Sequence, residues 1–126
     1  MNKNKILIVD DNDFCRDLLA EIFELDYEII QAKDGREALN ALAIQMGSLE
    51  AVLLDLVMPQ MNGFEFLDEL VNKGWFQKVP IIVVSSSTDE ETRDKCRSYG
   101  VKYFLSKPYK ASEALKTIKK AIKEFS

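Results

Sequence analysis

Residues 51–63 read AVLLDLVMPQMNG. An apolar run of strand length ends here at one carboxylate, Asp55, and a loop that contains Pro59 and Gly63 follows it. An ionised carboxylate buried by itself is costly, so Asp55 needs polar or cationic partners. A carboxylate at the end of a buried strand therefore predicts a functional site, whose other members should lie at the ends of the other apolar runs.

Short apolar runs alternate along the chain with longer segments of helical period. Strands are predicted at residues 5–10, 27–32, 51–55, 80–85 and 101–105. Helices are predicted at about residues 13–25, 34–46, 63–73, 89–98 and 111–124. This alternation predicts an α/β fold with a doubly wound, five-stranded parallel sheet. In such sheets ligands bind beyond the carboxyl ends of the strands.

Two of the helices carry specific expectations. The first is expected to turn five apolar side chains toward the core: Phe14, Leu18, Leu19, Ile22 and Phe23. The fourth, at 89–98, is highly charged and has little apolar surface, so we expect it to be the most mobile element.

Length and charge limit the function. The chain has 126 residues, which predicts one domain over 1–126 and no output domain. The net charge is −4, and the lysines near the end alternate with apolar positions, so binding of nucleic acid or membrane is not expected. No apolar run reaches the length of a signal or membrane span, and Cys15 and Cys96 lie in separate helical segments. A soluble cytoplasmic protein without disulfides is expected.

Polar residues follow four of the five predicted strands. Asp10 and Asp11 follow the first strand, Asp55 ends the third, Ser85 ends the fourth and Lys107 follows the fifth. Two carboxylates about 4 Å apart repel by about 4 kcal/mol at an effective dielectric constant of 20. Three carboxylates therefore need a cation, and Lys107 by itself leaves an excess of negative charge.

The donor set favours Mg²⁺. The chain contains no histidine, and oxygen ligands without histidine or cysteine are typical of a hard divalent ion. Asp11 and Asp55 are predicted as direct ligands, the Val57 backbone carbonyl as a third, and Asp10 as a ligand through water or an orienting group. A metal there would offset the charge of an incoming phosphoryl group, which makes the Asp55 carboxylate a candidate nucleophile that forms an acyl phosphate.

Each feature also has an ordinary structural explanation. A pair of aspartates after a strand is commonly a turn and a helix cap, a serine at a strand end is commonly a turn residue, and Lys-Pro is commonly a loop. Their joint occurrence at the expected strand ends favours the functional interpretation.

The chain resembles a response-regulator receiver domain of two-component signalling over about residues 5–124, and in particular a single-domain chemotaxis regulator. The matching segments are ILIVDD at 6–11, LLDLVMP at 53–59, MNG at 61–63, PIIVVS at 80–85 and KP at 107–108. The intervals are 44 residues from Asp11 to Asp55, 30 from Asp55 to Ser85 and 22 from Ser85 to Lys107.

The resemblance implies a flavodoxin-like (βα)5 fold with strand order 2-1-3-4-5. It also implies that Asp55 accepts a phosphoryl group, with Mg²⁺ required, from a phosphohistidine on a sensor histidine kinase or a histidine phosphotransfer protein. Lys107 would hold a phosphoryl oxygen, Ser85 would reorient toward another, and the Lys107–Pro108 bond would be cis. Such a chain catalyses its own phosphorylation and dephosphorylation and is not otherwise an enzyme.

Three residues differ from the family pattern or occupy positions that tune its chemistry. Phe104 stands where many receivers have a switching tyrosine; it is either a switch that works through packing alone or simply a core residue. Val57 and Ser87 occupy positions that face the attacking water in this family, and an apolar Val57 with a short Ser87 predicts a longer-lived phosphoryl group.

Signalling is then expected through a two-state shift of the fourth helix, fifth strand and fifth helix. With no output domain expected, the readout would be an unknown partner protein or a phosphorelay, and the chain would be a monomer or a phosphorylation-dependent dimer.

Other functions fit the motifs less well. A haloacid-dehalogenase-type phosphatase has a second acid two residues after its nucleophile, which is missing after Asp55. A flavodoxin needs a phosphate-binding loop where Asp10 and Asp11 would repel phosphate. A calcium loop that begins at Asp11 fails because Arg16 replaces the turn glycine and Ile22 replaces the closing glutamate.

Overall fold

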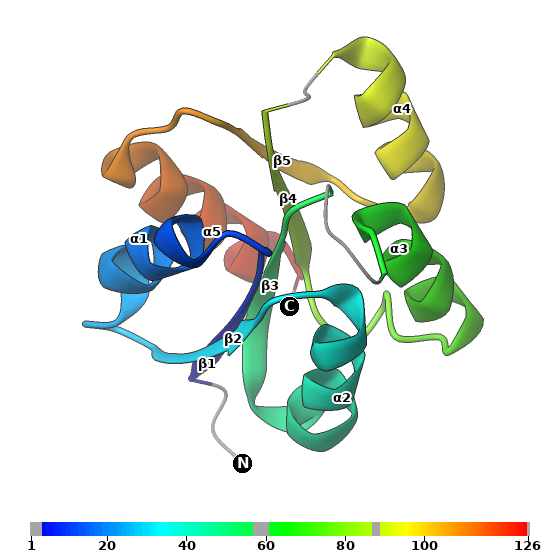
Figure 1. Cartoon of the computed structure of the whole chain (residues 1–126), viewed down its shortest axis with the longest axis horizontal. Helices are drawn as coiled ribbons and strands as arrows, with labels where there is room; N and C mark the ends of the chain where they lie inside the picture. The colour runs from blue at the N-terminus through cyan, green and yellow to red at the C-terminus, as the bar shows by residue number, and fades with distance from the viewer. Residues whose placement is uncertain (1–3, 57–60, 87–88, 126) are drawn as a thin grey trace.

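The computed structural model describes residues 4–56, 61–86 and 89–125. The strands are β1 (Lys5–Val9), β2 (Glu28–Ala32), β3 (Leu49–Leu54), β4 (Ile81–Ser85) and β5 (Tyr103–Ser106). The helices are α1 (Asp13–Phe23), α2 (Gly35–Gln45), α3 (Gly63–Asn72), α4 (Glu90–Tyr99) and α5 (Ala111–Phe125), with a 3-10 turn η1 at Met46–Ser48. The five strands pair in parallel in the order β2-β1-β3-β4-β5 (Figure 1). The predicted flavodoxin-like α/β fold is confirmed.

Helices cover both faces of the sheet (Figure 1). Leu7 and Val9 of β1 belong to an apolar cluster that they share with α2, α3 and α4. Ile6 and Ile8 of the same strand belong to a second cluster, shared with α1 and α5. Successive side chains of a strand point to opposite faces, so a continuous apolar run fills both layers at once.

The order of the strands fixes where a ligand can enter. The chain leaves β1 for β2 on one side and then crosses to β3 on the other side of β1. The connections after β1 and β3 therefore diverge, and they leave a crevice at the carboxyl ends of these two strands. Asp10 and Asp55 are the first residues after those strands.

Side-chain caps begin the helices that flank the crevice. The Asn12 side chain accepts a hydrogen bond from the Cys15 backbone N–H at 2.9 Å at the start of α1. Asn62 accepts one from the Glu65 backbone N–H at 2.9 Å, and the Glu65 side chain accepts one from the Asn62 backbone N–H at 3.2 Å. This reciprocal pair satisfies two N–H groups at the start of α3.

The last strand begins two residues later than predicted. Val101 is buried, but its N–H donates to the Cys96 carbonyl at 3.2 Å, and the Gly100 N–H donates to the Arg97 carbonyl at 3.0 Å. Gly100 has a φ of 113°, the left-handed conformation that closes a helix with this pair of bonds. Val101 therefore completes the end of α4 and does not belong to β5.

The predicted buried face of α1 is partly wrong. Leu19 and Phe23 are buried, whereas Phe14 is 75% exposed and Leu18 is 41% exposed. Leu19 and Phe23 form one row along the helix, and Phe14 and Leu18 form a row turned by about 100° from it. One stripe of α1 meets the core, and the second row points toward solvent.

None of the helices in the described ranges combines the length and the apolar character that a membrane span requires.

Candidate functional site

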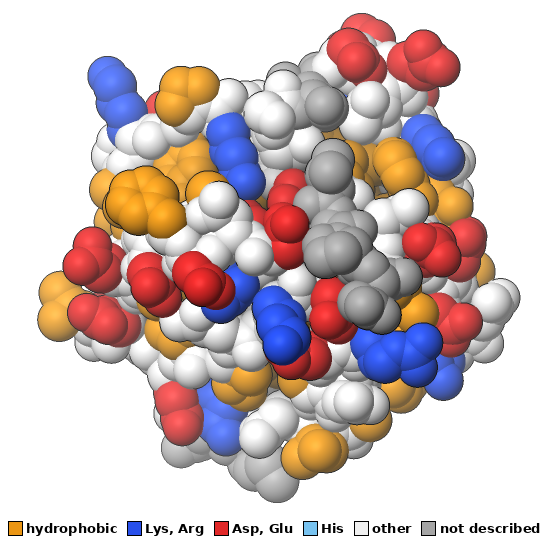
Figure 2. Space-filling view, in the orientation of Figure 1, with side chains coloured by type: hydrophobic (Ala, Val, Ile, Leu, Met, Phe, Trp, Pro, Cys, Tyr) orange, Lys and Arg blue, Asp and Glu red, His pale blue; other side chains and the backbone are white. Residues whose placement is uncertain are grey.

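Three carboxylates meet in the crevice between β1 and β3. One oxygen from each of Asp10, Asp11 and Asp55 lies within 4.8 Å of the other two. The backbone fixes this meeting, because the Asp55 N–H donates to the Val9 carbonyl at 2.9 Å and so extends the pairing of β3 with β1. Asp10 is 2% exposed and Asp55 is 8% exposed, while Asp11 is open to solvent. Figure 2 shows acidic side chains gathered near the middle of the visible face.

Lys107 reaches this group from the end of β5. Its Nζ donates to Asp10 Oδ2 at 3.0 Å. Burial lowers the pKa of the Lys107 ammonium, but the hydrogen bond to Asp10 and the charges of Asp55 and Asp10 outweigh burial, so this pKa is raised. Lys107 is therefore a permanent cation beside the carboxylates at neutral pH.

Ser85 is placed by the same pair of strands. It is 1% exposed, pairs with Ser106 across β4 and β5, and its carbonyl accepts a hydrogen bond from the Lys107 N–H at 3.0 Å. The peptide bond from Lys107 to Pro108 is cis, as predicted. The ends of β4 and β5 are thereby joined where the serine and the lysine leave the sheet.

Asp10 and Asp11 differ in how many of their carboxylate oxygens already accept hydrogen bonds from the protein. Asp10 Oδ1 accepts a hydrogen bond from the Asn12 N–H at 2.9 Å, and Asp10 Oδ2 accepts one from Lys107. Asp11 makes no hydrogen bond or ion pair within the described residues. Both Asp10 oxygens therefore already have protein donors, which suits an orienting or water-mediated role better than direct ligation.

The donor set fits Mg²⁺. The described part of the chain brings together three carboxylates, with no cysteine among them, and the sequence has no histidine. Oxygen donors of this kind bind hard cations, and Mg²⁺ commonly uses one or two carboxylates and keeps several waters. Asp10, Asp11 and Asp55 form the carboxylate group that could hold such an ion, and the assignment of Asp11 and Asp55 as its direct ligands stays a prediction.

Arg16 supports the site in a way that the sequence does not reveal. Its side chain is 13% exposed, and its guanidinium donates to the Asp10 carbonyl at 2.7 Å and to Gln31 Oε1 at 3.0 Å, and it also pairs with Asp13. Arg16 thus ties the loop that carries the aspartates to β2. The available signal was a lone arginine in the first helix after the Asp-Asp pair.

Gly63, which the sequence places in the loop after Asp55, has a packing role at the start of α3. A Cβ on Gly63 would lie 2.5 Å from the Leu56 Cα and 3.0 Å from the Asp55 carbonyl oxygen. The start of α3 therefore packs directly on the backbone that follows the phosphoacceptor candidate.

Val57 and Ser87 lie outside the described residues. For Phe104, both a switch role and a core role remain possible. The Val57 carbonyl and Ser87 fall in the ranges 57–60 and 87–88, so their roles stay predictions. Phe104 is half-buried in β5 and packs against the core, and the guanidinium carbons of Arg93 and Arg97 lie 5.4 and 5.5 Å from its ring centroid. Its ring thus contacts both the core and the surface.

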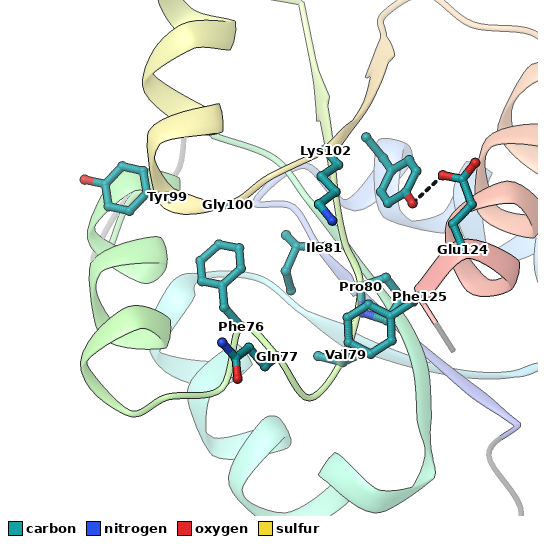
Figure 3. Close-up of a pocket in the computed structure, with 11 residues that line it drawn as sticks. Phe76, Gln77, Val79, Pro80, Ile81, Tyr99, Gly100, Lys102, Glu124 and Phe125 are labelled. Atoms are coloured by element: carbon teal, nitrogen blue, oxygen red, sulfur yellow. Dashed lines mark hydrogen bonds between the residues drawn. The ribbon is translucent and has the colours of Figure 1, made fainter.

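A second hollow, of about 410 Å³, lies at the other end of the sheet. Figure 3 shows the Lys102 side chain pointing into the space between Phe76 and Phe125, which line the hollow. Ile81, the first residue of β4, lines it, whereas Ser85 is at the opposite end of that strand. This hollow is therefore separate from the carboxylate site.

Comparisons with known proteins agree with this geometry. Residues 6–119 match the family model described as the response regulator receiver domain. The chain is 33% identical over 110 residues to the two-component response regulator-like PRR37 of Oryza sativa, which covers 86% of this chain and 15% of that protein. It is 33% identical over 121 residues to response regulator RR06 of Streptococcus pneumoniae, which covers 95% of this chain and 54% of that protein. The chain thus spans about half or less of these relatives.

Solved structures with the same fold include chemotaxis proteins. The CheX–CheY–BeF3–Mg²⁺ complex from Borrelia burgdorferi matches with a TM-score of 0.86 and 28% identity, over 93% of this chain and 87% of that chain. Chemotaxis protein CheY4 of Vibrio cholerae matches with a TM-score of 0.84 and 29% identity, over 94% of this chain and 98% of that chain.

Proposed function

The chain belongs to the response-regulator receiver family of two-component signalling, and on this basis we propose that Asp55 accepts a phosphoryl group from a partner phosphohistidine. The observation that supports this proposal is the meeting of Asp10, Asp11 and Asp55 within 4.8 Å beside the Lys107 ammonium. Receiver domains bind Mg²⁺ through acidic residues, and the donor of the phosphoryl group would be a sensor histidine kinase or a histidine phosphotransfer protein.

The proposed transfer is an in-line displacement. A carboxylate oxygen of Asp55 attacks the phosphorus, the new P–O bond forms as the P–N bond breaks, and the electron pair stays on the leaving imidazole nitrogen. Bound Mg²⁺ would supply positive charge to the phosphoryl oxygens. Lys107 would contribute a second cation, and Asp10 keeps it in place through the 3.0 Å hydrogen bond.

The proposed output is a conformational shift. Phosphorylation adds about −1.5 to −2 charge beside the three carboxylates. Ser85 would move its hydroxyl toward the phosphoryl group, and the space that it leaves would let Phe104 turn inward. The face made of α4, β5 and α5 would then change its affinity for a partner protein or for a second copy of the chain. On this proposal the chain acts on no other substrate.

A mass measurement tests the phosphoacceptor. Incubation with acetyl phosphate and Mg²⁺ should add one phosphoryl group to the wild type, and chelation of the metal should prevent the addition. Asp55→Ala should take up none, because the attacking oxygen is gone. Asp17→Ala, which removes an exposed carboxylate from α1, is the matched control and should be modified like the wild type. Modification of Asp55→Ala at the wild-type rate would remove Asp55 from this role.

The lifetime of the phosphoryl group is proposed to depend on Val57 and Ser87. An apolar Val57 gives the attacking water no hydrogen-bond partner. Val57→Asn should therefore speed the loss of the phosphoryl group, measured as the decay of the mass adduct after the donor is removed. An unchanged decay rate would argue against this role of position 57.

A further inference from the structure

The second hollow has the size of a small-molecule site. Its volume of about 410 Å³ falls within the range of ligand pockets, which is about 300 to 1,000 Å³. The connection between α3 and β4, the first residues of β4 and β5, and the last residues of α5 line it. These segments lie at the end of the sheet opposite to Asp55, so the proposed phosphoryl transfer does not use the hollow.

The walls of the hollow are largely apolar and aromatic. Val79 and Ile81 are almost completely buried, at 1% and 3% exposed, and they line the hollow together with the partly exposed rings of Phe76 and Phe125. The Phe76 ring packs on Gly100, where an added Cβ would lie 3.5 Å from the Phe76 Cδ1. Two aromatic rings with a space between them can accept the ring of a ligand through offset or edge contacts.

The hollow also contains a cation that the chain does not neutralise. The Lys102 side chain points into the space between Phe76 and Phe125 (Figure 3), and it makes no ion pair with any described residue. The other charged lining residue, Glu124, accepts a hydrogen bond from the Tyr103 hydroxyl at 2.7 Å. The Lys102 ammonium can therefore take a carboxylate as its counter-ion, while Glu124 would repel an anion that carries further negative charge.

We propose that the second hollow binds a small aromatic monocarboxylate. The ring of the ligand lies between Phe76 and Phe125, and its carboxylate accepts a charge-assisted hydrogen bond from the Lys102 ammonium. This inference goes beyond the proposed function and does not depend on the role of Asp55. The bound molecule would contact the connection before β4, the start of β5 and the end of α5 together, so it would resist relative movement of these segments.

An NMR titration that follows the backbone amides of the full chain tests this inference. The probe is 2-naphthoate, and its counterpart is 2-naphthamide, which has the same rings without the charge. Saturating naphthoate should shift the amide signals of residues 76–81 and 99–103, and naphthamide should bind more weakly. Lys102→Met keeps most of the side-chain stem but loses the charge, so it should weaken naphthoate binding about fivefold to tenfold and change naphthamide binding by less than about twofold.

Two further variants separate the role of charge from the role of the walls. Lys119→Met removes an exposed lysine of α5 that does not line the hollow, and it should bind naphthoate like the wild type. Phe125→Ala removes one aromatic wall, so it should weaken both probes by a similar factor. Phe125 is 37% exposed near the end of the chain, and thermal unfolding of each variant checks that the fold is kept.

Three outcomes would overturn the inference: naphthamide that binds as tightly as naphthoate, equal loss in Lys102→Met and Lys119→Met, or shifts that centre on Asp10 and Asp11. Asp55→Ala should bind naphthoate like the wild type, because Asp55 lies at the other end of the sheet. A wild type that gains a phosphoryl adduct but does not bind naphthoate would reject the hollow as a ligand site and leave the proposed function intact. Naphthoate binding without an adduct would support the ligand site and count against the proposed function.

Discussion

Arg16 holds the backbone of the aspartate loop rather than a reacting atom. Its guanidinium binds the Asp10 carbonyl at 2.7 Å and Gln31 Oε1 at 3.0 Å, so it fixes the peptide that connects Asp10 to Asp11. A residue in this position acts on a metal through the ligands that it orients, an effect that is commonly about tenfold or more in affinity.

Arg16→Gln should therefore weaken Mg²⁺ binding about tenfold, because the loop loses the charged donor that orients it. Isothermal titration calorimetry of the metal-free protein measures this directly, without any phosphodonor. Arg36→Gln, which removes an exposed arginine from α2, should leave the affinity unchanged. Unchanged Mg²⁺ affinity together with a lower melting temperature would make Arg16 a purely structural residue.

Gly63 is a second residue whose role depends on close packing. In Gly63→Ala the new methyl group would meet the Leu56 Cα at 2.5 Å, and backbone cannot move aside as a flexible side chain can. We expect a loss of about 1 to 3 kcal/mol in the free energy of unfolding, measured in urea. Gly47→Ala is the control, because its new Cβ would have no neighbour within 4 Å. Equal stability of the two variants would show that the start of α3 can shift away from the loop.

The sequence predicted that the polar residues at the strand ends meet at one site, whereas it did not predict the residues that support them. Asp10, Asp55 and Lys107 follow apolar runs, and parallel strands bring their carboxyl ends to one edge. Arg16 and Gly63 act through contacts with residues whose positions exist only after folding. Polarity and spacing carry no signal for such contacts.

Among the five α-helices, α4 buries the fewest residues and so has the weakest attachment to the core. It buries Cys96 alone of its residues, all of which are described, whereas α3 buries Phe66, Leu67 and Leu70 together with Gly63. The free energy that opposes local opening grows with buried apolar surface. The structure therefore supports the expectation that α4 opens more readily than α3.

Thiol labelling measures that opening. Cys96 is fully buried, and burial raises the pKa of its thiol, so it can react with Ellman's reagent only when α4 opens. In a Cys15→Ser background we expect Cys96 to react faster than the whole chain unfolds, with a rate that changes little in low urea. Labelling at the global unfolding rate would show that α4 opens only with the rest of the domain.

The boundaries of the elements differ from the prediction where an apolar residue does not make the backbone hydrogen bonds of the strand that its apolar run predicts. Val101 is apolar and buried, yet its N–H closes α4 instead of joining β5. Phe14 and Leu18 share the helical period of α1, yet both are exposed, because the period does not say which stripe meets the core. The alternation of strand and helix patterns predicted the parallel sheet correctly. The strand order was implied by the family resemblance and is also confirmed.

At the scale of the whole molecule, the fold redistributes charge in a way that net charge does not reveal. The lysines of α5 alternate with apolar residues in the sequence, which predicts no basic block. Folding places Lys116 and Lys120 opposite Arg93 and Arg97, across β5. Segments far apart in sequence thus form one basic groove, while the carboxylates gather at the ends of β1 and β3.

A hydrogen bond between β5 and α5 makes the stability of the fold depend on pH in the alkaline range. At the start of β5 the Tyr103 hydroxyl donates to Glu124 Oε1 at 2.7 Å, the dashed line in Figure 3, and so links β5 to α5. Burial, followed by the hydrogen bond to Glu124 and its charge, raises the pKa of Tyr103 from 10.0 to about 12. The folded chain therefore keeps a proton that the unfolded chain has lost, in the window between these two values.

Stability should consequently be complete below pH 10 with respect to this group and should fall as the pH rises from 10.0 to about 12. Tyr103→Phe removes the titrating hydroxyl, so its free energy of unfolding, measured in urea at points across this window, should decline less steeply than that of the wild type. Glu124→Gln should also reduce the slope, because a neutral acceptor raises the pKa less, whereas Glu21→Gln on the exposed side of α1 should not. Tyr109, whose pKa burial also raises to about 12, should leave a residual decline in every variant. An identical slope in Tyr103→Phe and the wild type would show that the bond between β5 and α5 does not contribute to stability at high pH.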